Sequence, residues 1–263
     1  MGAPLRFTVY YGERRFLLLA SRLVMEPRTP YRRIAPTLLL ACKEPFWLEC
    51  GEDITLSTRA ALIAPNTWRR RLVAVDSDLA VFELPLHSIR ATKPAQSLDI
   101  ESFLSLMPAL ERALGGSLPC AGLDALFEAA VRAIAGQVPA LRGGTSGALP
   151  AIDPRIERAL KLLDELPFDE ARLTGLANQL ALSPSRFRHL FKEVTGDTVG
   201  HYARWAAVWR AVSLWSQGQA LSDIVRQVGF PDLAHLDHAF NELFGVNPAS
   251  VLSPENVTLI HCP

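Results

Sequence analysis

The stretch LANQLALSPSRFRHLFKEVTG, residues 176–196, predicts a helix, a tight turn and a second helix. Ser183 is a favourable N-cap residue, Pro184 suits the first helical position, and Gly196 supplies the left-handed residue that ends many helices. At 100° per residue, the apolar side chains of the second helix share one arc: Phe187, Leu190, Phe191 and Val194. The polar side chains occupy the opposite arc: Ser185, Arg188, His189 and Lys192. The stretch therefore indicates a helix-turn-helix unit with a packing face and a basic face.

A second stretch, GFPDLAHLDHAFNELFGV at residues 229–246, repeats this design. At an offset of 49 the apolar positions recur as Leu236, Ala239, Phe240 and Leu243, and Gly196 maps onto Gly245. The preceding helices match at an offset of 48, which predicts a turn one residue longer in the second unit. Between the units, residues 201–217 form a predicted helix whose aromatic stripe suggests a rigid connector: Tyr202, Trp205, Trp209 and Val212.

The second unit keeps the packing positions and loses the cations. Its outward positions are Ala234, Asp237, His238 and Asn241. Residues 171–215 carry six cations and two anions, a net charge of +4, whereas residues 216–251 carry one cation and four anions, a net charge of −3. We therefore expect the second unit to contribute little electrostatic attraction to a polyanion.

Upstream of these units the chain has a β-rich part followed by a helical part. Short apolar or alternating runs up to about residue 92, broken by Gly, Pro, Asn and Asp, predict an antiparallel sandwich or small barrel. Residues 98–138 predict two amphipathic helices, which either form an oligomer interface or pack onto their own barrel. We expect a first domain at residues 1–140, a linker at 141–153 and a helical domain at 154–252.

Composition limits the class of protein. The 27 Lys and Arg residues balance the 27 Asp and Glu residues, so any basic patch must be local. The N-terminus lacks the pattern of a signal peptide, and we expect a soluble, cytoplasmic protein without a membrane segment. The four cysteines are scattered, without metal-ligand spacing: Cys42, Cys50, Cys120 and Cys262. We interpret them as core residues rather than a disulfide framework, with a redox-sensing pair as the alternative.

Taken together, two helix-turn-helix units joined by one helix, with the ordered series Gly229, Phe230, Phe240, Phe244, Gly245 and Pro248, resemble the DNA-binding domain of the AraC/XylS family of transcription regulators. The resemblance covers about residues 155–251. It implies an α+β protein of two domains, with an N-terminal cupin-like antiparallel β barrel, a helical dimerisation segment at 98–138 and a C-terminal all-α double helix-turn-helix domain. It also implies double-stranded DNA as a partner, a small-molecule effector, contact with RNA polymerase and a homodimer.

Carried over position by position, the resemblance places the recognition helices in the major groove of DNA. Ser185, Arg188 and His189 would meet base edges, and the guanidinium of Arg188 matches the two acceptors of guanine. Arg186 and Lys192 would contact phosphates. In the second unit the corresponding residues are Leu233, Ala234, His235, Asp237, His238 and Asn241.

The second unit departs from the family pattern. His238 stands where the family commonly has Arg, and Asn241 where it usually has Lys; in the connector and the first unit, Ala207-Val208 and Val199 are further departures. Three interpretations of the second unit stay open: it reads bases weakly, it faces a protein such as RNA polymerase, or it only supports the first unit. His235 and His238 lack a third ligand for a metal, so we expect groove-facing histidines, whose protonation would strengthen DNA binding.

For the first domain we expect a binding role rather than catalysis. The β-rich part contains one histidine, His87, too few for the metal site of a catalytic cupin, and no catalytic motif is visible, so we expect neither a cofactor nor a metal. An apolar effector pocket could be lined by Phe46, Trp47, Trp68 and Phe82, with Arg69 or Arg71 as an anion anchor; the alternative is ordinary core and surface. The leading hypothesis is a transcription regulator, and the alternative is a co-regulator that acts through protein contacts with little DNA binding of its own.

Overall fold

The computed structural model describes residues 6–12, 15–85, 93–138, 152–246 and 257–262. The chain divides into two compact units, of which the first comprises Met1–Leu149 with Gly245–Pro263 and the second Pro150–Phe244. The predicted linker at 141–153 falls almost wholly outside the described residues, and so does His87. The last segment of the chain groups with the first unit, so the second unit is an insertion between two parts of the first.

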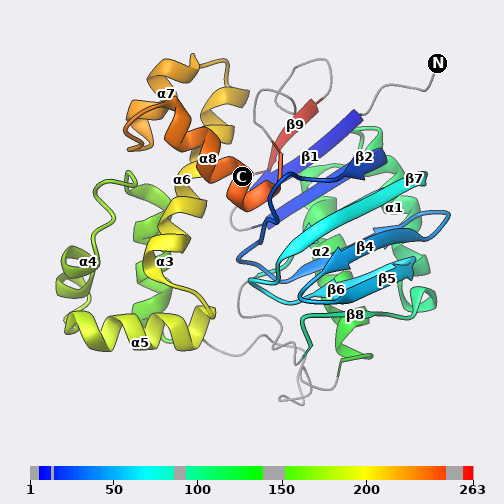
Figure 1. The fold of residues 1–263 in the computed structure, drawn as a ribbon, viewed down its shortest axis with the longest axis horizontal. Coiled ribbons are helices and arrows are strands. Elements are labelled where there is room, and N and C mark those ends of the chain that lie inside the picture. Colours follow the sequence, from blue (N-terminus) through cyan, green and yellow to red (C-terminus); the bar gives the residue numbers. More distant parts are fainter. Residues whose placement is uncertain (1–5, 13–14, 86–92, 139–151, 247–256, 263) are drawn as a thin grey trace. The chain divides into compact units, whose positions relative to one another are not determined.

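The first unit is built on one sheet (Figure 1). Its strands are β1 (Arg6–Gly12), β2 (Arg15–Met25), β3 (Thr37–Ala41), β4 (Phe46–Cys50), β5 (Ile54–Thr58), β6 (Ala60–Ile63), β7 (Arg69–Glu83), β8 (Ala95–Ser97) and β9 (Val257–Cys262). The predicted class, a β-rich domain followed by an all-α domain, is confirmed, but the sheet is not a closed barrel. Its strands follow the open order β8-β6-β3-β7-β2-β1-β9, with β4 paired to β7 and β5 paired to β4. Alternation along single strands reports which face is buried but not whether the two edge strands meet.

Strand β7 organises the sheet, because it pairs with β2, β3 and β4. It is one strand of 15 residues, which continues through the polar residues Asp76 to Asp78. Opposite that point β2 contains Arg22 at φ 57°, and the register of the β2–β7 pair shifts between Ser21 and Leu23. A bulge of this kind bends the paired strands without ending them.

Two separate hydrophobic clusters stabilise the first unit. One includes the apolar faces of the 3-10 helix η1 (Ile100–Leu106), α1 (Met107–Leu114) and α2 (Cys120–Ala135), packed on side chains of β1, β2, β3 and β7. The other cluster consists of side chains of β2, β3, β4, β6 and β7 and shares no residue with the first cluster. The alternative of packing onto their own sheet is thus realised for the helices of 98–138, whose apolar faces are buried within one chain. Dimerisation through their outward faces stays a prediction.

The interpretation of all four cysteines as core residues is wrong for one pair. Cys120, the first residue of α2, forms a disulfide with Cys262, the last residue of β9, across a sequence separation of 142. Cys42 and Cys50 are free thiols, half-buried and buried respectively. Spacing along the chain could not reveal the pair, because its two members meet only through the sheet.

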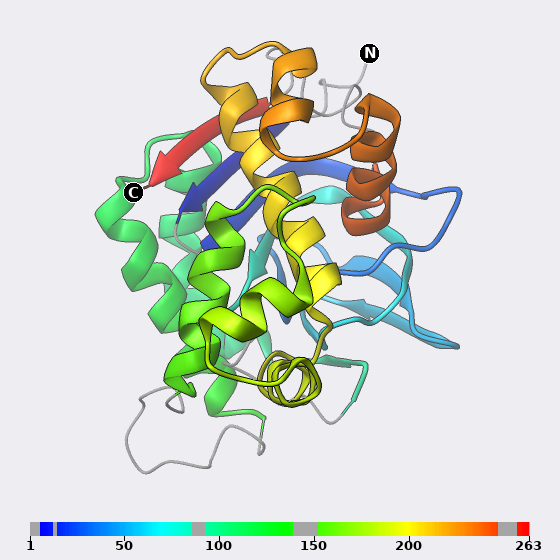
Figure 2. The same ribbon diagram turned by 90° about the vertical axis from the view of Figure 1, so that its left-hand side faces the viewer.

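The second unit is helical (Figure 2). It contains α3 (Pro154–Glu165), α4 (Leu173–Gln179), α5 (Pro184–Thr195), α6 (Val199–Ser216), α7 (Leu221–Gln227) and α8 (Leu233–Phe244). Helices α4 and α7 begin and end 48 residues apart, and α5 and α8 do so at 49, which confirms the predicted repeat and its extra turn residue. Within the described parts of the chain, each helix is too short or too polar to cross a membrane.

Candidate nucleic-acid interface

The first helix-turn-helix unit consists of α4 and α5, and its capping follows the sequence. The hydroxyl of Ser183 accepts a hydrogen bond from the backbone N–H of Arg186 at 3.2 Å, and Pro184 occupies the first turn. Gly196 ends the helix at φ 76°, a conformation that glycine adopts without a steric penalty. Phe187 and Phe191 are fully buried on the inner face. The inner face therefore fixes which side of α5 is turned outward.

The outward side of α5 is exposed and basic. All five predicted contact residues of this helix are exposed: Ser185, Arg186, Arg188, His189 and Lys192. None of the ion pairs recorded among the described residues involves Arg186, Arg188 or Lys192. These cations thus belong to a solvated surface, which is the arrangement that contact with phosphates and base edges requires.

The second unit consists of α7 and α8, and its turn shows how the extra residue is accommodated. In the first unit Ala181 takes the left-handed conformation at φ 53°, and Ser183 caps the next helix two residues later. In the second unit Gly229 takes that conformation at φ 79°, and Asp232 follows three residues later. Pro231 is therefore the inserted position, and Asp232 corresponds to the capping Ser183.

Two of the acidic residues of the second unit have structural partners. The carboxylate of Asp232 accepts hydrogen bonds from the backbone N–H of His235 at 2.9 Å and from its ring nitrogen Nδ1 at 2.9 Å. These bonds from His235 hold the pKa of Asp232 below its usual value. Glu242 pairs with Arg204 of α6, at 2.6 Å between Oε2 and Nη1. The first carboxylate caps α8 and the second joins α8 to the connector, so neither need face DNA as a bare charge.

The other outward positions of α8 are less accessible than those of α5. Leu233, Ala234, His235 and His238 are exposed, whereas Asp237 and Asn241 are half-buried. The amide of Asn241 donates a hydrogen bond to the backbone carbonyl of Asp237 at 3.2 Å. The exposed polar groups on this face are the two histidines, and no basic residue accompanies them.

A continuous series of ring contacts, here called the aromatic ladder, joins the two helix-turn-helix units through α6. Its members are Phe187 and Phe191 of α5, Tyr202, Trp205 and Trp209 of α6, and Phe244 and Phe240 of α8. Successive ring centroids lie 4.8–6.3 Å apart, within the range of favourable aromatic pairing. The stripe on α6 was predicted, but its partners on both recognition helices were not. The ladder fixes α5 and α8 to one rigid connector.

The sheet-containing unit, Met1–Leu149 with Gly245–Pro263, does not bring its predicted effector residues together. Phe46 and Phe82 are both fully buried, but they belong to the two separate hydrophobic clusters. Trp47 and Trp68 are 41% and 43% exposed. The assignment of these four residues to an effector pocket stays a prediction.

The sheet-containing unit also has three buried charged residues, which we call the buried arginine cluster: Arg33, Arg69 and Glu83. Arg33 pairs with Glu83 at 2.5 Å between Nη1 and Oε1, and Arg69 donates a hydrogen bond to the hydroxyl of Thr37 at 2.5 Å. Burial lowers the pKa of Arg69 to about 10, so the guanidinium stays charged at neutral pH. Two buried cations thus face one carboxylate. Of the three, the sequence analysis named only Arg69. A charged residue within an otherwise apolar strand was the available signal for Glu83, whereas Arg33 lies outside the strands.

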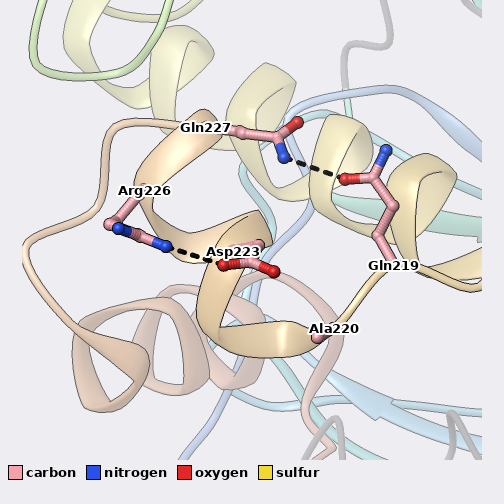
Figure 3. Close-up of a pocket in the computed structure, with 5 residues that line it drawn as sticks. All are labelled: Gln219, Ala220, Asp223, Arg226 and Gln227. Carbon is pink, nitrogen blue, oxygen red and sulfur yellow. Dashed lines mark hydrogen bonds and ion pairs between the residues drawn. The ribbon is translucent and has the colours of Figure 1, made fainter.

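An open depression of about 580 Å³ lies at the junction of α6 and α7 (Figure 3). It is lined by Gln219, Ala220, Asp223, Arg226 and Gln227. Arg226 pairs with Asp223 at 2.7 Å and Gln227 donates to Gln219 at 3.0 Å, so its polar groups are satisfied by one another. An open, polar and self-paired surface of this kind lacks the apolar lining of a small-molecule site.

Comparison with known proteins agrees with the geometry. Residues 176–253 match the model of a helix-turn-helix domain family. The chain is 32% identical over 93 residues to the transcriptional activator RhaR of Pectobacterium carotovorum, covering 35% of this chain and 32% of that protein. It is 28% identical over 102 residues to the arabinose operon regulatory protein of Escherichia coli, covering 38% and 35%. The match thus spans about a third of the length of these curated relatives.

Over most of its length, the fold of the chain is similar to that of a protein of known structure. The crystal structure of ToxT from Vibrio cholerae aligns with a TM-score of 0.57, covering 90% of this chain and 96% of that one at 13% identity. At this identity the alignment shows a shared fold, with a sheet domain followed by a helical domain. The two capped helix-turn-helix units and the family match over residues 176–253 thus show a C-terminal helix-turn-helix domain that is similar to those of these two regulators, and the alignment with ToxT shows a shared two-domain fold.

Proposed function

We propose that this protein regulates transcription by binding promoter DNA, with α5 as the principal recognition helix. The observation that carries the proposal is the exposed face of α5, where Arg186, Arg188 and Lys192 lie on a helix fixed by caps at both ends and by buried aromatic residues. Ser185 and His189 complete the surface offered to base edges. No comparable set of cations occurs on the described surface of α8.

The second helix-turn-helix unit would place α8 in the next segment of the groove, where it would contact bases more weakly than α5 does. The aromatic ladder holds α8 at a set distance from α5, so binding of α5 positions α8 near the duplex. There His235 and His238 would offer ring nitrogens to bases, and Leu233 and Ala234 small apolar contacts. With Glu242 paired to Arg204, the negative charge left to oppose DNA on this face is that of Asp237, since Asp232 caps the helix.

A salt titration tests DNA binding and the role of Lys192 together. The logarithm of the binding constant should fall linearly with the logarithm of salt concentration, by about 0.9 per phosphate neutralised. Lys192→Ala should therefore make the slope about 0.9 shallower and weaken binding to all sequences alike. Arg158→Ala, which removes one exposed cation from α3, is the matched control and should leave the slope unchanged. Equal slopes for the Lys192 and Arg158 variants would contradict the assignment of the interface.

For the sheet-containing unit we propose a carboxylate effector, anchored by the buried arginine cluster. ToxT has been solved with an unsaturated fatty acid and with (E)-4-(8-methylnaphthalen-1-yl)but-3-enoic acid, both of them carboxylates on an apolar body. In this chain Arg33 and Arg69 outnumber Glu83, and among the described residues Nε of Arg69 has no hydrogen-bond acceptor. Arg69 has neutral hydrogen-bond partners in Thr37 and Tyr31 and shares the carboxylate of Glu83 with Arg33. A buried cation without a carboxylate of its own is costly, and an anionic ligand would offset that cost.

Thermal unfolding of the full chain tests this effector class with the naphthalenyl butenoic acid as the probe. The acid should raise the unfolding temperature because it binds the folded state only, and its neutral primary amide should not. Arg69→Met should remove the effect, whereas Arg71→Met, an exposed cation two residues further along β7, should retain it. A shift of equal size with the amide, or no shift with either compound, would exclude an anion anchor.

The remaining features of the proposal concern partners. We propose a cytoplasmic homodimer that acts with RNA polymerase and performs no catalysis, as the resemblance to the AraC/XylS family implies. The competing function is a co-regulator that works through protein contacts, and the net charge of −3 over residues 216–251 favours it. A chain that shows no salt-dependent affinity for DNA would support the co-regulator.

A further inference from the structure

The Cys120–Cys262 disulfide encloses the whole second unit in one covalent loop. Cys120 begins α2 in the first part of the chain, and Cys262 ends β9 in the last part, while Pro150–Phe244 lie between them. The second unit is therefore joined to the first through both of its ends. Strand β9 begins at Val257, thirteen residues after α8 ends at Phe244, so the second recognition helix is directly upstream of this closing strand.

Apart from the disulfide, β9 is weakly held. It lies at the edge of the sheet and pairs in parallel with β1 alone, over six residues from Phe7↔Val257 to Gly12↔Cys262. Of its six side chains only that of Cys262 is buried. Three of the other side chains are half-buried and two are exposed. An edge strand paired on one side has a lower free energy of local opening than an internal strand, and a cross-link suppresses that opening because it limits the separated state.

Gly12 shows how closely the end of β9 must approach β1. A Cβ atom added at Gly12 would overlap the backbone carbonyl oxygen of Cys262. This oxygen belongs to the backbone and cannot move aside as the end of a flexible side chain would, so a larger residue at position 12 has to displace β9. This position offers a way to release the strand while both cysteines remain.

The two bonded cysteines differ chemically from the two free ones. Burial, with further effects of Asp78 and Glu111, raises the pKa of Cys42 to about 11, and burial raises the pKa of Cys50. Both stay protonated at neutral pH, and the thiol is the unreactive form. Cys120 is half-buried at the first turn of a 16-residue helix, where partial positive charge stabilises a thiolate. The reactive position and the cross-linked position thus coincide.

We propose that the Cys120–Cys262 disulfide is a redox-controlled tether that restrains the DNA-binding unit, and that its reduction releases β9 and raises affinity for DNA. Disulfides that form where thiols are normally kept reduced are most often redox-sensing, and a protein that binds chromosomal DNA works in such a compartment. This step rests on the proposed function. The closed loop limits the orientations in which α5 and α8 reach the groove, and release of one anchor removes that limit.

The chemistry is thiol–disulfide exchange. A dithiol reductant of the thioredoxin class attacks the more accessible sulfur, that of Cys120, so that the S–S bond breaks and a mixed disulfide forms while Cys262 leaves as a thiolate. The second thiol of the reductant then displaces Cys120. Two electrons and two protons pass to the protein as two thiols, and the reductant becomes a disulfide. Peroxide reverses the reaction: it takes two electrons from the two thiols, and two waters form as the S–S bond is restored.

The test compares the full chain in its oxidised and reduced forms, with thiols counted by alkylation and mass spectrometry. Reduction should increase amide hydrogen exchange in residues 257–262 by at least tenfold and tighten DNA binding several-fold at fixed salt. Cys262→Ser should behave as the reduced form under both conditions. Gly12→Val should increase exchange in residues 257–262 while the disulfide is intact, but should tighten DNA binding only after reduction, because the covalent loop stays closed until then. Cys42→Ser, the control, should switch like the parent chain.

The outcomes separate the tether from the proposed function. Unchanged exchange in β9 after verified reduction would overturn the tether, and so would equal or weaker DNA affinity in the reduced chain. If neither form binds DNA, the proposed function fails and control of DNA binding fails with it. The exchange of β9 would still show in that case whether the bond holds the strand.

Discussion

The Arg188→Ala variant is expected to bind its preferred DNA site about 5- to 150-fold more weakly than the parent chain, which corresponds to about 1–3 kcal/mol for a bidentate base contact. Arg188 is exposed on the outward side of α5 and takes part in none of the ion pairs among the described residues. Its guanidinium is therefore available to the two acceptors of guanine. The loss should fall on the preferred site and spare unrelated sequences.

Selection of bound genomic fragments measures this directly. The parent chain should enrich one motif, and Arg188→Ala should lose the preference at one position of that motif. Arg186→Ala is the matched control, because it removes a neighbouring exposed arginine assigned to phosphate and should weaken all sequences equally. A motif that survives Arg188→Ala unchanged would show that another residue reads the bases.

Much of the second unit was predictable because its determinants are local. Ser183, Pro184 and Gly196 specify where the twelve-residue helix α5 begins and ends, and the structure places them as predicted. The repeat added a second, independent reading of the same pattern. Even the longer turn followed from two offsets, and Pro231 is the extra residue that they require. Local signals of this kind do not depend on how the units are arranged.

The first unit was predicted less well because its determinants are contacts between distant residues. The alternating runs identified most strands, but closure of the sheet depends on which strands lie at its edges. Strand β9 comes from the far end of the chain, and its position beside β1 carries no local signal. Phe46 and Phe82 illustrate the same limit, because both are apolar strand residues whose different clusters become known only from the pairing of the sheet.

Two of the acidic residues of the second helix-turn-helix unit have structural roles that explain their presence. The sequence shows three carboxylates on a segment shaped for DNA, and this pattern left three interpretations open: weak reading of bases, contact with a protein, or support of the first helix-turn-helix unit. Asp232 replaces Ser183 as the N-cap, and Glu242 neutralises Arg204 on the connector. The charge count of −3 therefore overstates the repulsion that α8 itself would meet, and Asp237 is the residue on which the argument for a protein partner depends.

Replacement of Phe191 by alanine is expected to lower the free energy of unfolding of the second unit by about 3–5 kcal/mol, the usual range for a buried phenylalanine. Phe191 is fully buried and joins two members of the aromatic ladder, with ring centroids 5.8 Å from Phe187 and 5.9 Å from Tyr202. Its loss leaves a cavity at the point where α5 meets α6. Since a domain is stable by only about 5–15 kcal/mol, a large part of the stability is removed.

Urea unfolding followed by tryptophan fluorescence would report this loss, because Trp205 and Trp209 lie further along the same ladder. Glu193→Ala is the control: its side chain is exposed on the same helix, and the change should stay within about 0.5 kcal/mol. A decrease below about 1 kcal/mol for Phe191→Ala would mean that α6 holds α5 by other contacts. A decrease in the expected range, together with loss of DNA binding below the unfolding transition, would instead show that the ladder sets the position of the recognition helix as well as its stability.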